Sequence, residues 1–190
     1  MLARVGVCVR ARSPRLVWTG QATRVTAEQV LALLELLARS GVETWVDGGW
    51  GIDALVGHHT RHHADLDLVV ATTSVSTARS LLEREGFVVT RDWLPTAIAL
   101  RHHDGAEVDL LTVEPSADGG DDQVQLDGIR RFHYDPPVTG SIGGVEVRCC
   151  PASTQVRAHM GYEPTETDYT DMRLLRDHLG VALPPPYDQV

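Results

Sequence analysis

A pair of glycines between an apolar strand and an apolar helix constrains the fold of this chain more than any other feature. Glu43–Val46 has the character of a short strand, and Asp47, Gly48 and Gly49 follow it directly. An apolar helix is predicted to follow around Ile52–Val56. Because glycine has no Cβ atom, backbone N–H groups at this turn can approach a phosphate, and the helix N-terminus adds positive potential. The segment therefore predicts an anion-binding turn, although such turns alone are common.

Two acidic residues follow at the start of a second predicted strand. Asp65 and Asp67 border the apolar run Leu66–Val70. Side chains alternate along a strand, so these carboxylates project from one face about 6 to 7 Å apart. Like charges held this close repel unless a cation lies between them, and carboxylate oxygens favour Mg²⁺. The spacing predicts a magnesium site.

A third acid stands within an apolar run further along the chain. Asp109 interrupts Val108–Val113, which is expected to be a central strand. A buried acid needs a partner. If the partner is the same metal site, three carboxylates provide a two-metal centre suited to phosphoryl displacement, with Asp109 placed to accept a proton. The alternative is an ion pair with an arginine such as Arg101.

Helices and strands are predicted to alternate along most of the chain. The predicted helices span about 26–41, 52–56, 74–85, 153–160 and 165–180, and the predicted strands 43–46, 66–70, 87–91, 96–101, 107–113 and 145–149. Asp104 and Gly105 predict a hairpin, and Glu114–Val124 is expected to be a loop. The order indicates an α/β (α+β) fold, a mixed sheet flanked by helices with a small C-terminal helical segment.

The expected organisation is one compact unit with an appendage at each end. Residues 1–24 are Arg-rich and lack periodicity, and are expected to be a disordered extension. The core is expected at 25–150, and a helical segment with an irregular tail at 151–190. The cysteines Cys8, Cys149 and Cys150 have no disulfide spacing and are interpreted as packing residues.

Charge and hydropathy exclude several classes of protein. The 190 residues carry a formal net charge of −9, which argues against nucleic-acid binding and suits metal ions or a cationic small molecule. No apolar run is long enough to span a bilayer. A cytoplasmic protein without membrane or nucleic-acid partners is expected, and a homodimer is left open.

A family resemblance rests on the residues around the glycine pair. The motif consists of Trp45-Val46-Asp47-Gly48-Gly49-Trp50-Gly51-Ile52-Asp53, then Gly57, Thr60-Arg61, His63 and Asp65-Leu66-Asp67. It resembles the signature of the antibiotic nucleotidyltransferases of the polymerase-β superfamily. Lincosamide nucleotidyltransferases are the most similar branch, and aminoglycoside 2″-adenylyltransferases come next. The similarity extends over about residues 26–180 and includes Trp93-Leu94-Pro95, Val108-Asp109-Leu110 and the stretch from Tyr162 to Asp168.

The resemblance implies a polymerase-β-type fold and a reaction. The reaction is Mg²⁺-dependent transfer of AMP from ATP to a hydroxyl of a lincosamide or aminoglycoside, with release of pyrophosphate and with two ions expected. Asp65, Asp67 and Asp109 are implied to be metal ligands and catalytic residues, with Asp109 as the base. The implied nucleotide-binding residues are Gly48, Gly49, Arg61 and His63.

The acceptor is less constrained than the chemistry. Trp93, Tyr162 and Tyr169 are candidates for an acceptor pocket, although aromatic side chains occur as often in cores. The strand after Trp93 departs from the lincosamide branch, because Ala97 and Ala99 replace expected charged residues. An acceptor that is not an antibiotic, and a catalytically silent nucleotide-binding relative, are the alternatives.

Histidines offer a competing interpretation as metal ligands. They form three adjacent pairs, His58 and His59, His62 and His63, and His102 and His103. Neighbouring histidines in loops usually point apart, and His103-Asp104, which resembles an HD-type phosphohydrolase dyad, falls in a predicted hairpin. A zinc or HD-type site is therefore disfavoured, and Asp53 is interpreted as a structural hydrogen-bonding residue.

Overall fold

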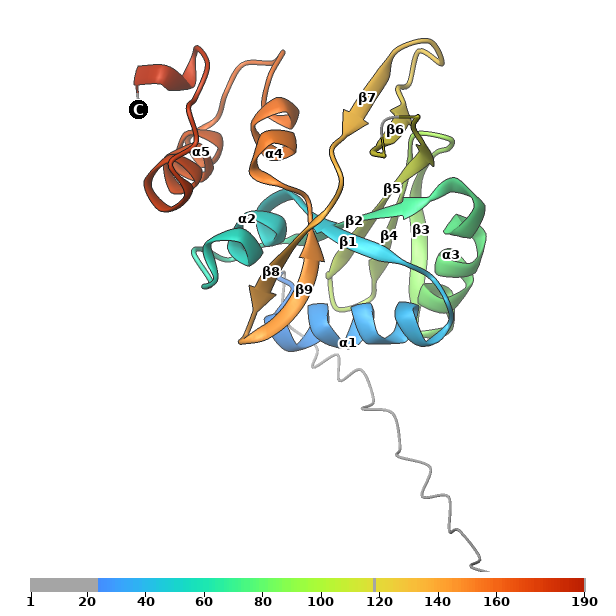
Figure 1. Cartoon of the computed structure of the whole chain (residues 1–190). Helices are drawn as coiled ribbons and strands as arrows, with labels where there is room; N and C mark the ends of the chain where they lie inside the picture. Colours follow the sequence, from blue (N-terminus) through green and yellow to red (C-terminus); the bar gives the residue numbers. More distant parts are fainter. Residues whose placement is uncertain (1–23, 118, 190) are drawn as a thin grey trace, which may run out of the picture.

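A mixed nine-stranded sheet organises the protein in the computed structural model, which describes residues 24–117 and 119–189 (Figure 1). The strands are β1 (Thr44–Asp47), β2 (Asp65–Ala71), β3 (Phe87–Trp93), β4 (Ala97–His102), β5 (Glu107–Pro115), β6 (Asp121–Val124), β7 (Arg131–Tyr134), β8 (Val138–Ile142) and β9 (Val145–Cys149). The main path runs β3-β4-β5-β2-β1-β9-β8, with β6 paired to β5 and β7 to β6. Strands β2 and β5 are parallel, as are β1 and β9, and the other pairs are antiparallel.

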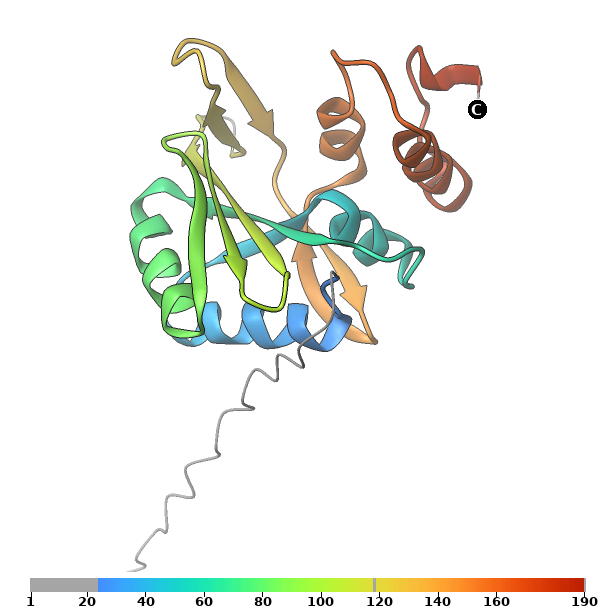
Figure 2. The same cartoon turned by 180° about the vertical axis from the view of Figure 1, so that it is seen from behind.

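Two helices cover one face of the sheet, and three others group together beyond one end of it (Figure 1). They are α1 (Ala27–Arg39), α2 (Gly48–Val56), α3 (Val75–Arg84), α4 (Ala152–Ala158) and α5 (Glu166–Leu179), with 3₁₀ turns at Thr72–Ser74 and Tyr187–Gln189. Helices α1 and α3 pack against one face of the sheet (Figures 1 and 2). Both views place α4 and α5 beside α2, away from α1 and α3. The mixed sheet with flanking helices and a C-terminal helical segment confirms the predicted fold class.

Alternation along β2 divides the sheet into an apolar face and an acidic face. Leu66, Leu68 and Val70 are fully buried in the core formed with α1 and α3. Because neighbouring side chains in a strand point to opposite faces, Asp65 and Asp67 project from the other face. The hydrophobic face thereby fixes the orientation of the acids.

Capping boxes begin two of the predicted helices. Thr26 and Gln29 exchange hydrogen bonds at the start of α1, and Thr165 and Asp168 do so at the start of α5. Each box satisfies two N–H groups that a helix end leaves unpaired. The helix starts were therefore readable from local sequence.

The beginning of α2 differs from the prediction. Gly48 and Gly49 were expected to form a turn before a helix near Ile52, but the helix begins at Gly48. Gly48 has φ +57°, a conformation that costs glycine little. The glycine pair thus lies in the first turn of α2, whose N–H groups have no partner within the helix itself.

The prediction of a loop at Glu114–Val124 is partly wrong. It contains the end of β5 and all of β6. Strand β6 begins with Asp121 and Asp122, and β7 and β8 are also short and were not predicted. Each of the three strands has only four or five residues and at most two large apolar side chains, too few for a periodic pattern to mark it.

Several sequence-based expectations fall at the limits of the described residues. The proposed extension at 1–24 lies outside them except for Arg24, whose Nη1 is 3.1 Å from His62 Nε2. Cys149 and Cys150 are buried, as expected of packing residues, whereas Cys8 lies outside. Among the helices of residues 24–117 and 119–189, none has both the length and the apolar character needed to cross a membrane.

Candidate active site

Three aspartates form one row across three neighbouring strands. Asp47 at the end of β1 is registered with Asp67 on β2, and Asp67 is registered with Asp109 on β5. Directly paired residues project from the same face of a sheet, and neighbouring strands lie about 4.8 Å apart. The structure therefore brings Asp67 and Asp109 side by side and adds Asp47, which we define together as the carboxylate row.

Asp65 lies one step along the same face. It is registered with Glu107 on β5, two residues before Asp109. Asp65 is exposed, whereas the side chain of Glu107 is largely covered. The acidic face thus contains two parallel rows, and all three sequence-predicted carboxylates belong to it.

Burial raises the pKa values of the three aspartates in the carboxylate row. Burial raises the pKa of Asp67 well above its ordinary value, and the charges of Asp65, Asp47 and Asp109 raise it further. Burial also raises the pKa of Asp47, against hydrogen bonds from Gly48, Cys150 and Tyr134. Asp47 Oδ1 has no hydrogen-bond partner among the described residues. Each acid is held where its charged form is disfavoured, so the row favours a cation.

One arginine partly neutralises the outer end of the row. Arg91 Nη2 lies 2.7 Å from Glu107 Oε1 and 3.2 Å from Asp109 Oδ2. Burial raises the pKa of Asp109 to about 6, although the Arg91 guanidinium opposes that shift. The alternative partner considered for Asp109, Arg101, instead donates to Glu107, with Nε 2.9 Å from Oε2.

The first turn of α2 packs directly against the row. A Cβ atom at Gly48 would collide with Asp67 Oδ2, so only glycine allows this approach. A Cβ atom at Gly49 would collide with the His63 ring and lie 2.7 Å from Arg61 Nη2. The N-terminus of α2 is therefore enclosed by an acid on one side and by His63 and Arg61 on the other.

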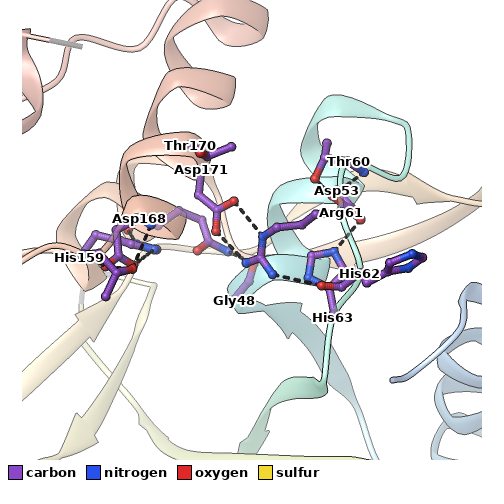
Figure 3. Close-up of polar contacts among 12 residues, drawn as sticks. Gly48, Asp53, Thr60, Arg61, His62, His63, His159, Asp168, Thr170 and Asp171 are labelled. Atoms are coloured by element: carbon purple, nitrogen blue, oxygen red, sulfur yellow. Dashed lines mark hydrogen bonds and ion pairs between the residues drawn. The ribbon is translucent and has the colours of Figure 1, made fainter. Parts of the chain in front are cut away.

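The predicted nucleotide-binding residues Arg61 and His63 both have protein partners (Figure 3). Arg61 makes a two-point ion pair with Asp171 of α5, with Nη2 2.8 Å from Oδ2 and Nε 3.2 Å from Oδ1. His63 Nε2 lies 2.7 Å from Asp53 Oδ2. A nucleotide contact by Arg61 or His63 stays a prediction, while the Asp171 pair fixes α5 to the loop before β2.

Asp171 and Asp47 were missed as site residues. Asp171 is 2% exposed and lies on the buried face of α5 with Met172 and Leu175. An acid on the apolar face of an amphipathic helix is the signal that could have identified it, because a buried charge needs a partner. Asp47 had a similar signal, since it ends a buried strand immediately before the glycine pair.

The three acceptor-pocket candidates have different surroundings. Trp93 is 48% exposed, with the Arg91 guanidinium 5.1 Å from its ring centroid. Tyr162 is also exposed and donates a hydrogen bond to Asp168. Tyr169 packs in the small C-terminal core, with its ring centroid 5.4 Å from that of Tyr187. Their shared role at an acceptor stays a prediction.

The alanines that depart from the resembled branch lie beside the row. Ala99 on β4 is the registered partner of Asp109, and Ala97 is paired with Leu111 two residues further along β5. Both share the face of Asp109 because they are two apart on one strand. The departure therefore concerns the immediate surroundings of the predicted base.

Comparisons with known proteins identify the family and the relatives of this chain. The family model for aminoglycoside-2″-adenylyltransferase matches residues 29–175. A lincosamide resistance protein from Staphylococcus haemolyticus is 28% identical over 153 residues, covering 80% of this chain and 95% of that protein.

Two solved structures share the fold. The lincomycin-bound lincosamide antibiotic adenylyltransferase LnuA is 26% identical, with a TM-score of 0.72 over 80% of this chain and 98% of LnuA. ANT(2″)-Ia in complex with adenylyl-2″-tobramycin is 19% identical, with a TM-score of 0.64 over 81% and 89% of the two chains, and shows likeness of fold alone. Since the family model spans most of the sequence, this chain belongs to the aminoglycoside-2″-adenylyltransferase family of nucleotidyltransferases.

Proposed function

We propose that this enzyme transfers AMP from ATP to a hydroxyl group of a lincosamide antibiotic, with aminoglycosides as the second acceptor class. The observation that carries the proposal is the alignment of Asp67 with Asp109 beside the glycine turn of α2. Polymerase-type phosphoryl transfer needs this combination of metal-binding carboxylates and an anion-binding turn.

The acidic face fits divalent magnesium. Its donors are carboxylate oxygens, the ligands that Mg²⁺ prefers, and burial and neighbouring acids disfavour their charged forms without a cation. Asp65, Asp67 and Asp109 would hold two ions, with Asp47 supporting Asp67 from the adjacent strand. When bound, Mg²⁺ would neutralise charge on the triphosphate and favour ionisation of the acceptor hydroxyl.

The protein residues then have separate roles. The acceptor oxygen attacks the α-phosphorus, a new P–O bond forms, and the bond to the leaving pyrophosphate breaks. Asp109 accepts the hydroxyl proton; burial raises its pKa to about 6 in the metal-free protein, and even there the carboxylate is mostly ionised at neutral pH. Free N–H groups in the first turn of α2 face the triphosphate.

The choice of acceptor rests on charge and on the relatives. A chain with a formal net charge of −9 attracts cations, and lincosamides and aminoglycosides both carry basic amines. The two relatives above 25% identity have names that specify lincosamides, so lincosamides come first.

Mass spectrometry of an antibiotic panel tests the proposal. Lincomycin, clindamycin and several aminoglycosides are incubated separately with the enzyme, Mg²⁺ and ATP, and GTP, CTP and UTP are compared. The expected product is lincomycin or clindamycin carrying one added AMP, together with pyrophosphate. Asp67→Asn should abolish the product, and Glu114→Gln, which removes an exposed acid further along β5, should not.

Two outcomes would contradict the proposal. If no antibiotic gains AMP but another hydroxyl compound does, the proposed acceptor class is wrong and the proposed adenylyl transfer is right. Calorimetric binding of a non-hydrolysable ATP analogue without pyrophosphate release on any acceptor would indicate a silent relative.

A further inference from the structure

A second group of ligand side chains lies on α2 and the loop that follows it. Asp53, His59 and His63 each offer one donor atom, and these atoms all lie within 4.8 Å of one another. Asp53 Oδ2 is 2.7 Å from His63 Nε2 and 2.9 Å from His59 Nδ1. This group, which we call the Asp53 cluster, is the one among the described residues whose donor atoms meet so closely.

Hydrogen bonds from Thr60 fix the orientation of the Asp53 carboxylate. Thr60 donates to Asp53 Oδ1 through its backbone N–H, at 3.1 Å, and through its hydroxyl. Figure 3 shows Asp53 between Thr60 and His63. One carboxylate oxygen is thereby held, and the other is directed at two imidazoles. Metal-binding carboxylates are typically oriented by such supporting hydrogen bonds.

Trp50 orients the two imidazole rings. Its ring centroid lies 5.2 Å from that of His59, nearly parallel at 27°, and 4.9 Å from that of His63. The side chain of His63 is 2% exposed and that of His59 is 46% exposed. The cluster is therefore buried on the side of Asp53 and His63, and it reaches solvent at His59, the side from which an ion would enter.

The donor set matches a transition-metal ion better than Mg²⁺. Two imidazole nitrogens with one carboxylate oxygen and an open fourth position are typical of Zn²⁺, whereas Mg²⁺ takes oxygen ligands. Zinc–ligand bonds of about 2.0 Å in a tetrahedron separate ligand atoms by about 3.3 Å. Because Asp53 Oδ2 lies 2.7 Å from His63 Nε2 and 2.9 Å from His59 Nδ1, both imidazole rings must withdraw by a few tenths of an ångström when an ion enters.

We propose that Asp53, His59 and His63 bind one Zn²⁺-type ion, at a site separate from the carboxylate row. The ion takes the place of the hydrogen atoms between Asp53 Oδ2 and the two imidazoles, so each neutral ring coordinates through the nitrogen that faces Asp53 and carries its proton on the other ring nitrogen. It joins α2 to the loop that carries Arg61, and Arg61 pairs with Asp171 of α5. The bound ion accordingly stabilises the connection between the core and the C-terminal helices.

Cobalt absorption spectroscopy tests the site. The chelator-treated full-length protein is titrated with Co²⁺ in excess Mg²⁺, so that the carboxylate row is occupied by its own ion. One equivalent of Co²⁺ should produce the intense visible bands of a four-coordinate ion, and Zn²⁺ should displace them. Trp50 fluorescence should change over the same titration, because its ring contacts both histidines.

Two neighbouring histidines provide a matched pair of variants. His59→Ala should weaken binding by roughly tenfold or more, since loss of even a supporting residue costs a metal site about that much. His62→Ala should leave binding unchanged, because His62 is an exposed neighbour on the same loop outside the cluster. Zn²⁺ should raise the melting temperature of the wild type and of His62→Ala, but not of His59→Ala.

Either of two results would overturn the proposal. Absence of the cobalt bands in the wild type would mean that the cluster is a hydrogen-bonded group only. Equal Co²⁺ affinity in the wild type and His59→Ala would place the ion elsewhere on the histidine-rich loop. Circular dichroism of each variant establishes that it is folded, and neither readout depends on adenylyl transfer.

Discussion

Aspartates lie at two places along the short helix α2, and their surroundings shift their pKa values in opposite directions. At the start of α2, Asp67 is surrounded by other acids that raise its pKa. Further along α2, burial raises the pKa of Asp53, but hydrogen bonds from His63 and Thr60 outweigh burial and lower it. In the carboxylate row, hydrogen bonds to Asp47 and the Arg91 contact with Asp109 do not offset burial, whereas in the Asp53 cluster the donors outweigh it.

The difference teaches how buried acids indicate function. A carboxylate with a full set of protein donors is stable in its charged form without any ligand. A carboxylate next to other carboxylates is stable only when protonated or when a cation is present. The row therefore fits an external cation, whereas the Asp53 cluster is satisfied by its own hydrogen bonds, and an ion proposed there would have to replace them.

The largest expected contrast is between matching substitutions in the two groups. Asp67→Asn should reduce turnover by roughly two to three orders of magnitude, because a metal ligand at the reaction centre is lost. It should also preserve or raise the melting temperature, since repulsion in the row is relieved. Steady-state rates and thermal melts measure both effects.

Asp53→Asn should show the reverse pattern. It weakens the hydrogen bonds that Asp53 accepts from His59, Thr60 and His63, and should lower the free energy of unfolding by roughly 2 to 3 kcal/mol. At temperatures where the variant is folded, it should keep most of its turnover. Loss of turnover with unchanged stability in Asp53→Asn would remove the distinction between the two groups.

A second contrast uses two glycines at opposite ends of α2. Gly48→Ala should lower activity by about a hundredfold, because the new Cβ displaces Asp67 and alters the turn facing the triphosphate. Gly57→Ala has the same positive-φ cost, but its Cβ would meet open space. Both variants should lose a similar amount of stability, and only Gly48→Ala should lose activity. Equal activity in the two variants would contradict the argument that Gly48 packs against Asp67.

A smaller effect concerns the arginine beside the predicted base. Arg91→Gln removes the charge that holds down the pKa of Asp109, so that pKa should rise above about 6. The acidic limb of the pH–rate profile should move to higher pH, and the rate in the acidic range should fall by up to about tenfold if the limb moves by one pH unit. Arg101→Gln, which contacts Glu107 instead, should leave that limb in place.

The smallest effect is on the stability of the magnesium-free protein. The pKa of Asp109 is raised on folding from 3.8 to about 6, so its contribution is complete below pH 3.8 and is lost as pH rises through about 6. The melting temperature should therefore decline over this interval, and less so in Asp109→Asn. Adding Mg²⁺ should reverse the decline, and a pH-independent difference between the two proteins would contradict it.

Local rules in the sequence determined much of the fold. The capping residues Thr26 and Thr165 marked the starts of α1 and α5, and the Asp104-Gly105 turn predicted the β4–β5 hairpin. Strand alternation placed Asp65 and Asp67 on one face. These features involve residues only a few positions apart, so periodicity, turn chemistry and capping decide them without the rest of the chain.

Tertiary structure alone decided the neighbours of the acids. The parallel pairing of β2 with β5 sets Asp109 beside Asp67, and the antiparallel β1 adds Asp47. Arg91 rather than Arg101 forms an ion pair with Asp109, and Arg61 forms one with Asp171 on the distant helix α5. Strand register and the packing of remote helices depend on the whole hydrophobic core, which local sequence cannot specify. The sequence by itself determined which residues carry the charge, and the folded core determined which charges meet.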